Sequence, residues 1–178
     1  FEASEIDLMT GRTVDLSEYT PRGSARNNEY ITNQMTFIGY NTANPLLSGV
    51  ETRQGLSNIV DKDSIVNSTI YSRGKASNIP INPSSIFYYD TSTKFKPDEI
   101  LTTQHLGNDK WGLDNDGKYV RHVGAQKQVL QFEILTNSDS AEKVNIANEV
   151  ADSYTRFGIP TTVTALPYDE YIARINAK

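Results

Sequence analysis

The nitrogen and sulfur side chains that bind transition metals are scarce in this sequence. His105 and His122 are its only histidines, and they do not pair at the three- or four-residue spacing that places two ligands on one helical face. We therefore expect both to be surface or helix-capping residues. The chain contains no cysteine, which excludes disulfides, thiolate metal sites and a cysteine nucleophile.

The segment Asp114–Gly117, which reads Asp-Asn-Asp-Gly, invites comparison with a calcium-binding loop. If Gly117 took the place of the invariant glycine of an EF-hand, Gly112 would replace the first carboxylate ligand and Val123 the bidentate glutamate. Neither of these side chains can bind a cation. A plain turn is the better interpretation, and we predict no metal site.

Catalytic patterns are equally lacking. No serine stands in a Gly-x-Ser-x-Gly elbow, and neither Gly-x-Gly-x-x-Gly nor the phosphate-binding loop pattern occurs. The carboxylate pairs Asp98–Glu99 and Asp169–Glu170 are adjacent in sequence, so their side chains point apart on a helix and suit solvated helix starts. We predict that the chain is not an enzyme and uses no cofactor.

Aromatic side chains are better candidates for binding. Tyr168 and Tyr171 lie in Pro167–Arg174, directly after a predicted strand, and ligands of open α/β sheets sit beyond the carboxyl ends of strands. Tyr168, at the strand exit, is the better ligand-facing candidate. Tyr171 either joins it or packs the following helix against the sheet. We interpret the cluster Phe87–Tyr89 as a plug beneath a long loop.

The elements that position these tyrosines begin with an alternating segment, Val129–Leu135, which predicts a strand. Asp139, followed three residues later by Glu142, can form a capping box for the next helix. That helix is predicted by apolar residues at three- and four-residue spacing. These are Ala141, Val144, Ala147, Val150, Ala151, Tyr154 and Phe157.

The predicted helix has a clear end. Gly158 suits a left-handed C-cap, and Pro160 prevents a further turn. The β-branched run Thr161–Leu166 then predicts a second strand. A strand, a capped helix and a strand of these lengths form a right-handed βαβ unit with parallel strands, which indicates an α/β fold.

The preceding chain is more varied. The segment Met35–Asn41 has apolar residues at alternating positions on both faces, which predicts a strand in the interior of a sheet. Ile6–Met9 resembles a shorter strand. Val50–Val60 predicts a helix, and Asp61 is suited to cap a second one. Pro97 suits the first position of a short helix that ends at Gly107.

A long segment rich in Ser, Asn and Pro, Lys75–Lys96, predicts a covering loop. Tyr119 and Val120 are expected to start a small hairpin. We find no internal repeat and no linker that would divide the chain, so residues 1–178 are interpreted as one structural unit.

Composition limits the function classes. The 178 residues are 37% hydrophobic and 22% charged, as in an ordinary globular domain. A net charge of −5 and scattered Lys and Arg argue against nucleic-acid binding. No apolar run approaches the ~20 residues that span a bilayer. The amino terminus lacks the features of a signal peptide and an initiating Met, so we expect a fragment whose targeting signal lies upstream.

Several segments together resemble the large lobe of family 5 extracellular solute-binding proteins, the oligopeptide, dipeptide and nickel receptors of ABC importers. The similarity has the right order and spacing from about Glu5 to Lys178. Gly55 departs from the family's usual Ala, and Leu46–Leu47 from its Pro-Phe. The matching segments are Phe37–Leu47, Val50–Leu56, Ile59–Val66, Ala76–Pro83, Phe157–Ile159 and Tyr168–Tyr171.

The resemblance implies one lobe of a periplasmic-binding-protein-like (type II) clamshell, with a mixed sheet and flanking helices. A second lobe of the same protein would close over a peptide or other small solute, for delivery to ABC permease subunits. The location would be periplasmic, extracellular or lipid-anchored at the cell surface. Tyr168 stands where the family commonly has a cavity-lining Trp. The alternative is a surface interaction or adhesion domain built on the same lobe.

Overall fold

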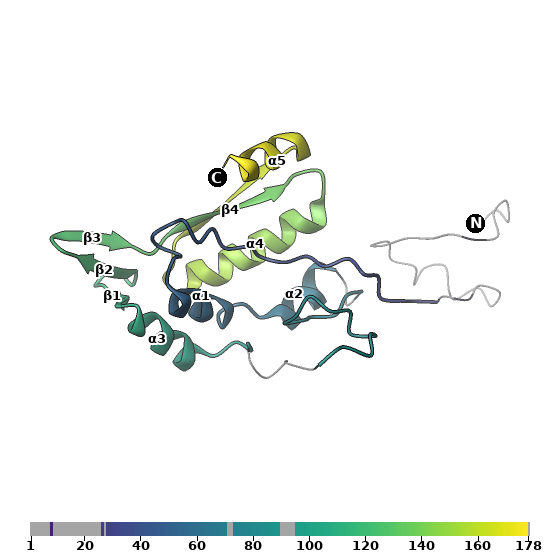
Figure 1. Ribbon diagram of the computed structural model, residues 1–178, viewed down its shortest axis with the longest axis horizontal. Coiled ribbons are helices and arrows are strands. Elements are labelled where there is room, and N and C mark those ends of the chain that lie inside the picture. The colour runs from purple at the N-terminus through teal and green to yellow at the C-terminus, as the bar shows by residue number, and fades with distance from the viewer. Residues whose placement is uncertain (1–7, 9–25, 27, 71–72, 90–94, 178) are drawn as a thin grey trace.

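The computed structural model describes residues 8, 26, 28–70, 73–89 and 95–177 (Figure 1). The strands lie between residues 112 and 166, whereas helices alone occupy residues 50–108 of the described part. The elements are α1 (Val50–Ser57), α2 (Lys62–Thr69), α3 (Glu99–Asn108), β1 (Gly112–Leu113), β2 (Tyr119–Val123), β3 (Gln126–Val129), β4 (Phe132–Asn137), α4 (Ala141–Arg156), β5 (Thr161–Leu166) and α5 (Tyr168–Asn176).

The predicted βαβ unit is present as β4, α4 and β5. The two strands pair in parallel over their whole length, from Phe132 opposite Thr161 to Asn137 opposite Leu166. Helix α4 lies along one face of the pair and α5 along the other (Figure 1). Alternation along β4 explains this arrangement, because the Phe132 ring meets Tyr154 of α4 while Glu133 points to α5. The α/β class is confirmed.

Helix α4 ends as the sequence predicts. Gly158 has a left-handed φ of 92°, and its N–H donates to the carbonyl of Thr155 at 3.1 Å. The N–H of the buried Ile159 donates to the carbonyl of Tyr154 at 2.9 Å. These two bonds form a Schellman motif, which satisfies two carbonyls at the helix end and turns the chain directly into β5.

The first strand of the unit is displaced from its prediction. The segment Val129–Leu135 is not one strand, because β3 ends at Val129 and β4 begins at Phe132. Between them, Leu130 is buried and donates its N–H to the carbonyl of Tyr119 at 2.8 Å. Strand β4 then continues through Asn137, two residues past the predicted end at Leu135. Pairing with β5, rather than the apolar pattern, therefore sets its carboxyl end.

Strands β1, β2 and β3 form a separate antiparallel sheet, which contains the predicted hairpin starting at Tyr119. The N–H of Tyr119 donates to the carbonyl of Gly158 at 3.0 Å, and its ring stacks on Phe157 at 5.6 Å between centroids. The hairpin is thereby attached at the start of β5. In Figure 1 it lies at the left of the molecule, away from the tip of the β4 arrow.

Short polar side chains start α2 and α3. Asp61 caps α2 as predicted, since its Oδ1 accepts the N–H of Ser64 at 3.0 Å. Asp98 caps α3 by accepting the N–H of Leu101 at 2.8 Å. Pro97 therefore precedes the cap, and its predicted place as first helical residue is wrong. The local reason is that Asp98 is a much better N-cap than Pro97.

Helix α1 begins at Val50 as predicted, but its cap comes from far along the chain. Its N-cap residue is Gly49, which has no side chain to offer. The Oδ2 atom of Asp109 accepts the N–H of Thr52 at 2.7 Å and its Oγ1–H at 2.6 Å. Trp111 completes the group by donating Nε1–H to Thr52 Oγ1 at 2.9 Å. Asp109 thus substitutes for a local cap and joins α1 to the end of α3.

The hydrophobic core lies where α1, α3, α4 and the two sheets meet. Its members come from α1 and α3 with their flanking residues, from the hairpin and from the βαβ unit, so the helical first half and the βαβ unit share one core. The buried members are Leu47, Leu56, Val60, Leu106, Trp111, Tyr119, Leu130, Val150, Tyr154 and Ile159. Burial raises the pKa of the Tyr154 phenol well above its ordinary value, and this hydroxyl contacts that of Tyr40 at 3.2 Å.

The predicted interior strand at Met35–Asn41 is absent. Among the described residues, this segment pairs with no strand, and the Phe37 side chain is 75% exposed. Alternating apolar residues cannot form a strand without a partner for their backbone groups. The predicted strand at Ile6–Met9 lies, apart from Leu8, outside the described residues.

The predicted covering loop is observed in its described part, since residues 75–89 and 95–96 contain no helix or strand. The aromatic cluster within it is not a plug, however. Phe87 is 77% exposed and Tyr89 is 76% exposed.

In the described part of the chain, no helix combines the length and apolar character needed to cross a membrane.

Candidate functional site

The carboxyl ends of β4 and β5 form the edge at which the sequence predicts ligand binding. Because the strands are parallel, both end at this edge, and the N–H of Ser138 extends the pairing by donating to the carbonyl of Leu166 at 2.8 Å. Tyr168 follows as the first residue of α5, with 55% of its surface exposed. Its side chain is therefore available at the position that open α/β sheets use for ligands.

Asp139 anchors Tyr168 at this edge. Its Oδ2 accepts the backbone N–H of Tyr168 at 3.1 Å, which is one of the donors that a helix start leaves without an internal partner. Pro167, the N-cap residue of α5, provides no side-chain acceptor. The capping box predicted for Asp139 is wrong, since Ser140 caps α4 by accepting the N–H of Lys143 at 3.4 Å. Sequence reasoning missed this role because Asp139 and Tyr168 are 29 positions apart.

Tyr171 lies one turn further along α5 and is half-buried. The same helix is held to β4 by an ion pair in which Arg174 Nη2 contacts Glu133 Oε2 at 2.6 Å. Thr164 of β5 donates its hydroxyl to the other oxygen of Glu133. Glu133 thus connects α5 to β4 and β4 to β5, so the two tyrosines are carried on a helix with a defined position over the sheet.

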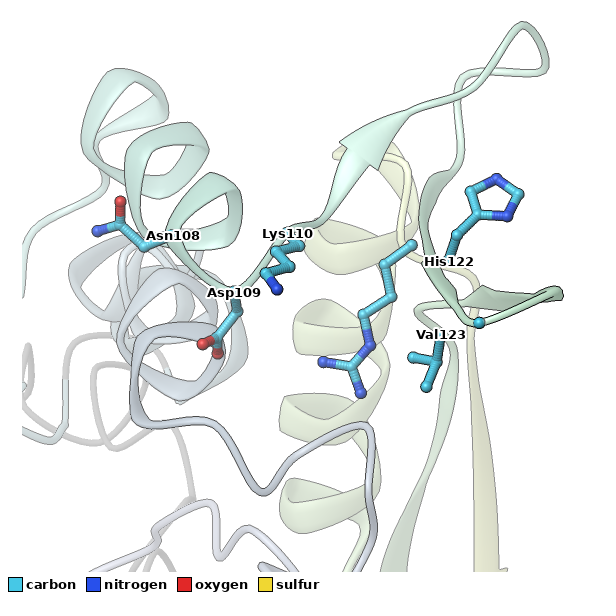
Figure 2. Close-up of a pocket in the computed structure, with 7 residues that line it drawn as sticks. Asn108, Asp109, Lys110, His122 and Val123 are labelled. Carbon is cyan, nitrogen blue, oxygen red and sulfur yellow. The ribbon is translucent and has the colours of Figure 1, made fainter.

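A polar pocket of about 520 Å³ lies away from this edge, between the end of α3 and strand β2 (Figure 2). One of its lining residues is Arg121, whose guanidinium lies over the Trp111 ring at 4.2 Å from the ring centroid. Arg121 also donates Nε–H to Gln128 Oε1 at 2.9 Å and Nη2–H to the carbonyl of Pro45 at 3.0 Å. The pocket is lined by Asn108, Asp109, Lys110, Arg121, His122, Val123 and Gly124.

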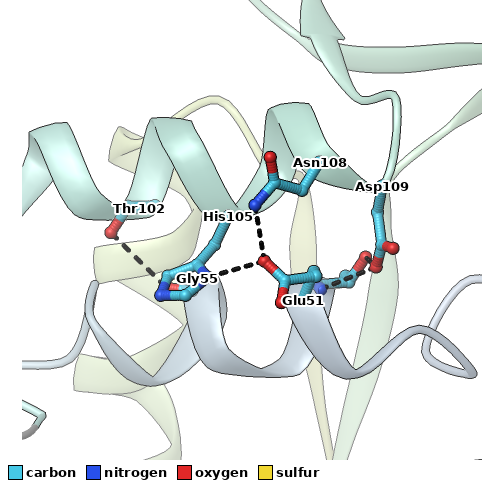
Figure 3. Close-up of polar contacts among 7 residues, drawn as sticks. Glu51, Gly55, Thr102, His105, Asn108 and Asp109 are labelled. Atoms are coloured by element: carbon cyan, nitrogen blue, oxygen red, sulfur yellow. Dashed lines mark hydrogen bonds and ion pairs between the residues drawn. The ribbon is translucent and has the colours of Figure 1, made fainter.

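The two histidines have different surroundings. His122 is exposed on β2, as predicted for a surface residue. His105 is half-buried, and its Nδ1 lies 2.9 Å from Glu51 Oε2, so it joins α3 to α1 (Figure 3). Asn108 donates Nδ2–H to the same oxygen at 2.8 Å. The hydrogen bond from Asn108, followed by that from His105, lowers the pKa of Glu51.

The Asp114–Gly117 segment is a turn, as predicted. Asp114 Oδ1 accepts the N–H groups of Asp116 and Lys118, each at 3.0 Å, and Oδ2 accepts from Lys127 Nζ at 2.8 Å. The hydrogen bond from Lys127 contributes most to lowering the pKa of Asp114. The Asp114 carboxylate therefore closes the turn and connects it to Lys127 of β3. Within the described residues, no group of three or more His, Asp or Glu side chains is placed to hold a metal ion.

Comparison with known proteins identifies a family. The model of the bacterial extracellular solute-binding proteins, family 5 Middle, matches residues 1–178. The oligopeptide-binding protein AppA of Bacillus subtilis (strain 168) is 24% identical over 180 residues. That match covers 98% of this chain but only 32% of AppA. The chain thus spans about a third of the length of this curated relative.

Solved structures have the same fold. AppA in complex with a nonapeptide superposes with a TM-score of 0.68 at 24% identity, over 77% of this chain and 27% of AppA. NikZ from Campylobacter jejuni, in complex with Ni(L-His), gives a TM-score of 0.63 at 23% identity, over 72% of this chain and 25% of NikZ. A mannohexaose-bound oligopeptide-binding protein from Thermotoga maritima gives a TM-score of 0.59 at 19% identity, over 74% of this chain and 25% of that protein.

Proposed function

Because the chain belongs to the bacterial extracellular solute-binding proteins of family 5, we propose that it is part of a receptor that captures a solute for an ABC importer. The observation that carries this proposal is the family match along all 178 residues. The resemblance of the fold to a peptide-bound AppA supports it. We further propose that the receptor binds its solute without chemically changing it.

The ligand class that we favour is a peptide. AppA is described as an oligopeptide-binding protein, and its sequence aligns with 98% of this chain. Solved relatives at lower coverage hold a nickel–histidine complex or mannohexaose, so a chelate and an oligosaccharide are the competing classes. Peptide capture fits an edge at which tyrosine offers both an apolar ring and a hydroxyl.

Tyr168 is the proposed contact residue for this solute, with Tyr171 as the second. Support for Tyr168 comes from its position beyond the carboxyl end of β5 and from its 55% exposure. The hydrogen bond from its N–H to Asp139 fixes the backbone of α5 at this point. For Tyr171, packing against the sheet is the competing role, because its side chain is half-buried.

The proposed receptor is a clamshell of which residues 1–178 form part of one lobe. The family description names a middle part, and the chain spans 32% of AppA, which supports a lobe that is completed by further sequence. Closure of a second lobe over the solute would increase the population of the shut state, which the permease subunits would recognise. We place the receptor in the periplasm or outside the cell, with lipid attachment at the cell surface as the finer proposal.

Titration calorimetry on the full-length protein tests this function. Peptides of two to nine residues, a nickel–histidine complex and mannohexaose are supplied in separate titrations. We expect saturable binding of peptides, and we expect Tyr168→Ala to weaken it about tenfold, since loss of a desolvated aromatic contact removes on the order of 1–2 kcal/mol.

Tyr89→Ala is the matched control, because Tyr89 is also exposed but lies in the loop between α2 and α3. Equal weakening by both variants would contradict the assignment of Tyr168 while leaving solute capture intact. Binding of none of the three solute classes would contradict the receptor proposal itself. Attachment of cells to a surface that depends on this protein would instead favour the adhesion alternative, which no relative named above suggests by its description.

A further inference from the structure

Two helices of this protein end in the same motif, but with different residues at the critical position. Helix α4 places Gly158 in the left-handed region. At the end of α3, the N–H of Lys110 donates to the carbonyl of Gly107 and that of Trp111 to the carbonyl of Leu106, each at 2.9 Å. This is again a Schellman motif, yet its left-handed residue is Lys110, with φ of 66°.

A lysine at this position has an energetic cost. Left-handed φ brings Cβ close to the backbone, which is why glycine is strongly preferred there and asparagine is the usual substitute. Lys110 is the only non-glycine residue with positive φ in the described part of the chain. Backbone strain of this kind motivates a search for a function of the side chain.

The Lys110 side chain lines the polar pocket (Figure 2). Among the residues that the structure describes, no acceptor pairs with its ammonium group. Arg121 lines the same pocket and is held on the Trp111 ring. Its contacts with Gln128 and Pro45 use two of the five guanidinium N–H donors, and the other three remain for a ligand.

The one carboxylate that lines the pocket is already engaged. Asp109 Oδ2 accepts two hydrogen bonds from Thr52 at the amino-terminal end of α1, where the helix dipole favours a negative charge. A Cβ added at Gly49 would overlap this carboxylate, which shows how closely it is pressed against α1. Asp109 is therefore held by the start of α1, and the two cations face the pocket beside it.

We propose that this pocket binds a small oxyanion, a carboxylate or a phosphate, between Lys110 and Arg121. The planar guanidinium supplies paired donors, and the ammonium adds a mobile point charge. The site is separate from the proposed solute edge, because the hairpin that carries Arg121 is attached at the start of β5 through Tyr119, whereas Tyr168 follows the end of β5.

The test uses the full-length protein at low ionic strength, with calorimetric titrations of inorganic phosphate and, separately, of citrate. We expect one saturable site. Lys110→Gly should weaken binding about fivefold, the loss expected for one partly exposed charge contact, and at the same time raise the Tm by removing the left-handed strain. Lys110→Arg should retain binding. A phosphate response without a citrate response would identify a phosphate site.

Lys118→Gln is the control, because Lys118 is exposed in the turn between β1 and β2 and does not line the pocket. The proposal is overturned if neither anion gives saturable heat, or if Lys118→Gln weakens binding as much as Lys110→Gly. Arg121→Lys is a second test of the site. It keeps the positive charge but loses the paired donors, so it should also weaken anion binding. Peptide titrations should be unchanged by Lys110→Gly, which separates this result from the proposed solute capture.

Discussion

The cap that Asp109 provides for α1 predicts an unusual response at Gly49. Replacing an N-cap glycine by serine is ordinarily neutral or stabilising by a few tenths of a kcal/mol, and the extended backbone of Gly49, with φ of −67°, accepts any residue. Here the position beside Gly49 is filled, since an added Cβ would overlap the Asp109 carboxylate. We expect Gly49→Ser to destabilise the protein.

The magnitude follows from the contacts that would be disturbed. Asp109 accepts two short hydrogen bonds from Thr52, whose side chain is fully buried. A hydrogen bond to a charged group contributes about 1.5–3 kcal/mol, and a buried N–H left without an acceptor costs about 1–3 kcal/mol. Asp109→Ala should therefore lower the free energy of unfolding by about 2–4 kcal/mol. Gly49→Ser, which only displaces the carboxylate, should cost about 1–2 kcal/mol.

The combination of the two changes is the decisive measurement. Without the carboxylate, a serine at the N-cap has room to accept the N–H of Thr52 itself. The double variant Gly49→Ser/Asp109→Ala should then be about 1 kcal/mol more stable than Asp109→Ala alone, although Gly49→Ser destabilises the wild type. Urea denaturation followed by circular dichroism gives all four free energies of the cycle.

One result would refute this reasoning. If Gly49→Ser stabilised the wild type, or if its effect were the same with and without Asp109, the carboxylate could not be the cap of α1. Asp116→Ala is the control, because that aspartate lies exposed in the β1–β2 turn and should change stability by less than about 0.5 kcal/mol.

Two further predictions concern the helix ends and the α1–α3 contact. Gly158→Ala should lower the free energy of unfolding by more than about 2 kcal/mol, because φ is 92° and a Cβ would overlap a backbone oxygen of the β1–β2 turn. Gly107→Ala should instead raise it by about 1 kcal/mol, since Gly107 lies in α3 with open space around it. Urea denaturation measures both. The pKa of Glu51 is lowered from its ordinary 4.5 by Asn108 and His105, so the stability it adds is present above pH 4.5 and lost as the pH falls through the folded-state pKa. The wild type should accordingly exceed Glu51→Gln in stability at pH 7, and the difference should disappear once the pH is below the folded-state pKa of Glu51; a difference that persisted there would contradict the contact.

Features determined by neighbouring residues could be predicted from the sequence. The glycine at position 158 marks the end of α4 because only a residue without Cβ suits the left-handed turn there. Asp61 marks the start of α2 because its carboxylate reaches an N–H three residues ahead. Apolar spacing then located α4 itself. Each of these signals acts within a few residues, so the order of elements in the βαβ unit was predictable.

Features that depend on distant partners could not be predicted. Asp139 has the sequence context of a helix cap, yet it accepts the N–H of Tyr168, whose proximity depends on the pairing of β4 with β5. The alternating residues at Met35–Asn41 fit a strand, but no partner strand is found in the described part of the chain. Lys110 gave no signal at all, because a left-handed φ is not expected of lysine.

The position of the candidate site could be predicted from the sequence, whereas the contacts that support it could not. The βαβ pattern located Tyr168 at a strand exit, which needs only the order of elements and the rule for parallel sheets. The carboxylate that anchors it, and the ion pair of Glu133 with Arg174 that holds α5, are contacts across 29 and 41 positions of sequence. Such contacts become visible only once the fold is known.

The distant cap of α1 also has a consequence for how the protein is made. An isolated helix of eight residues is unstable in water, and α1 has no cap of its own. Asp109 is synthesised 57 residues after Thr52, so a ribosome must add the whole α2–α3 segment before α1 can be completed. We expect amide-exchange labelling during refolding to protect the Thr52 N–H together with α3, and not before it.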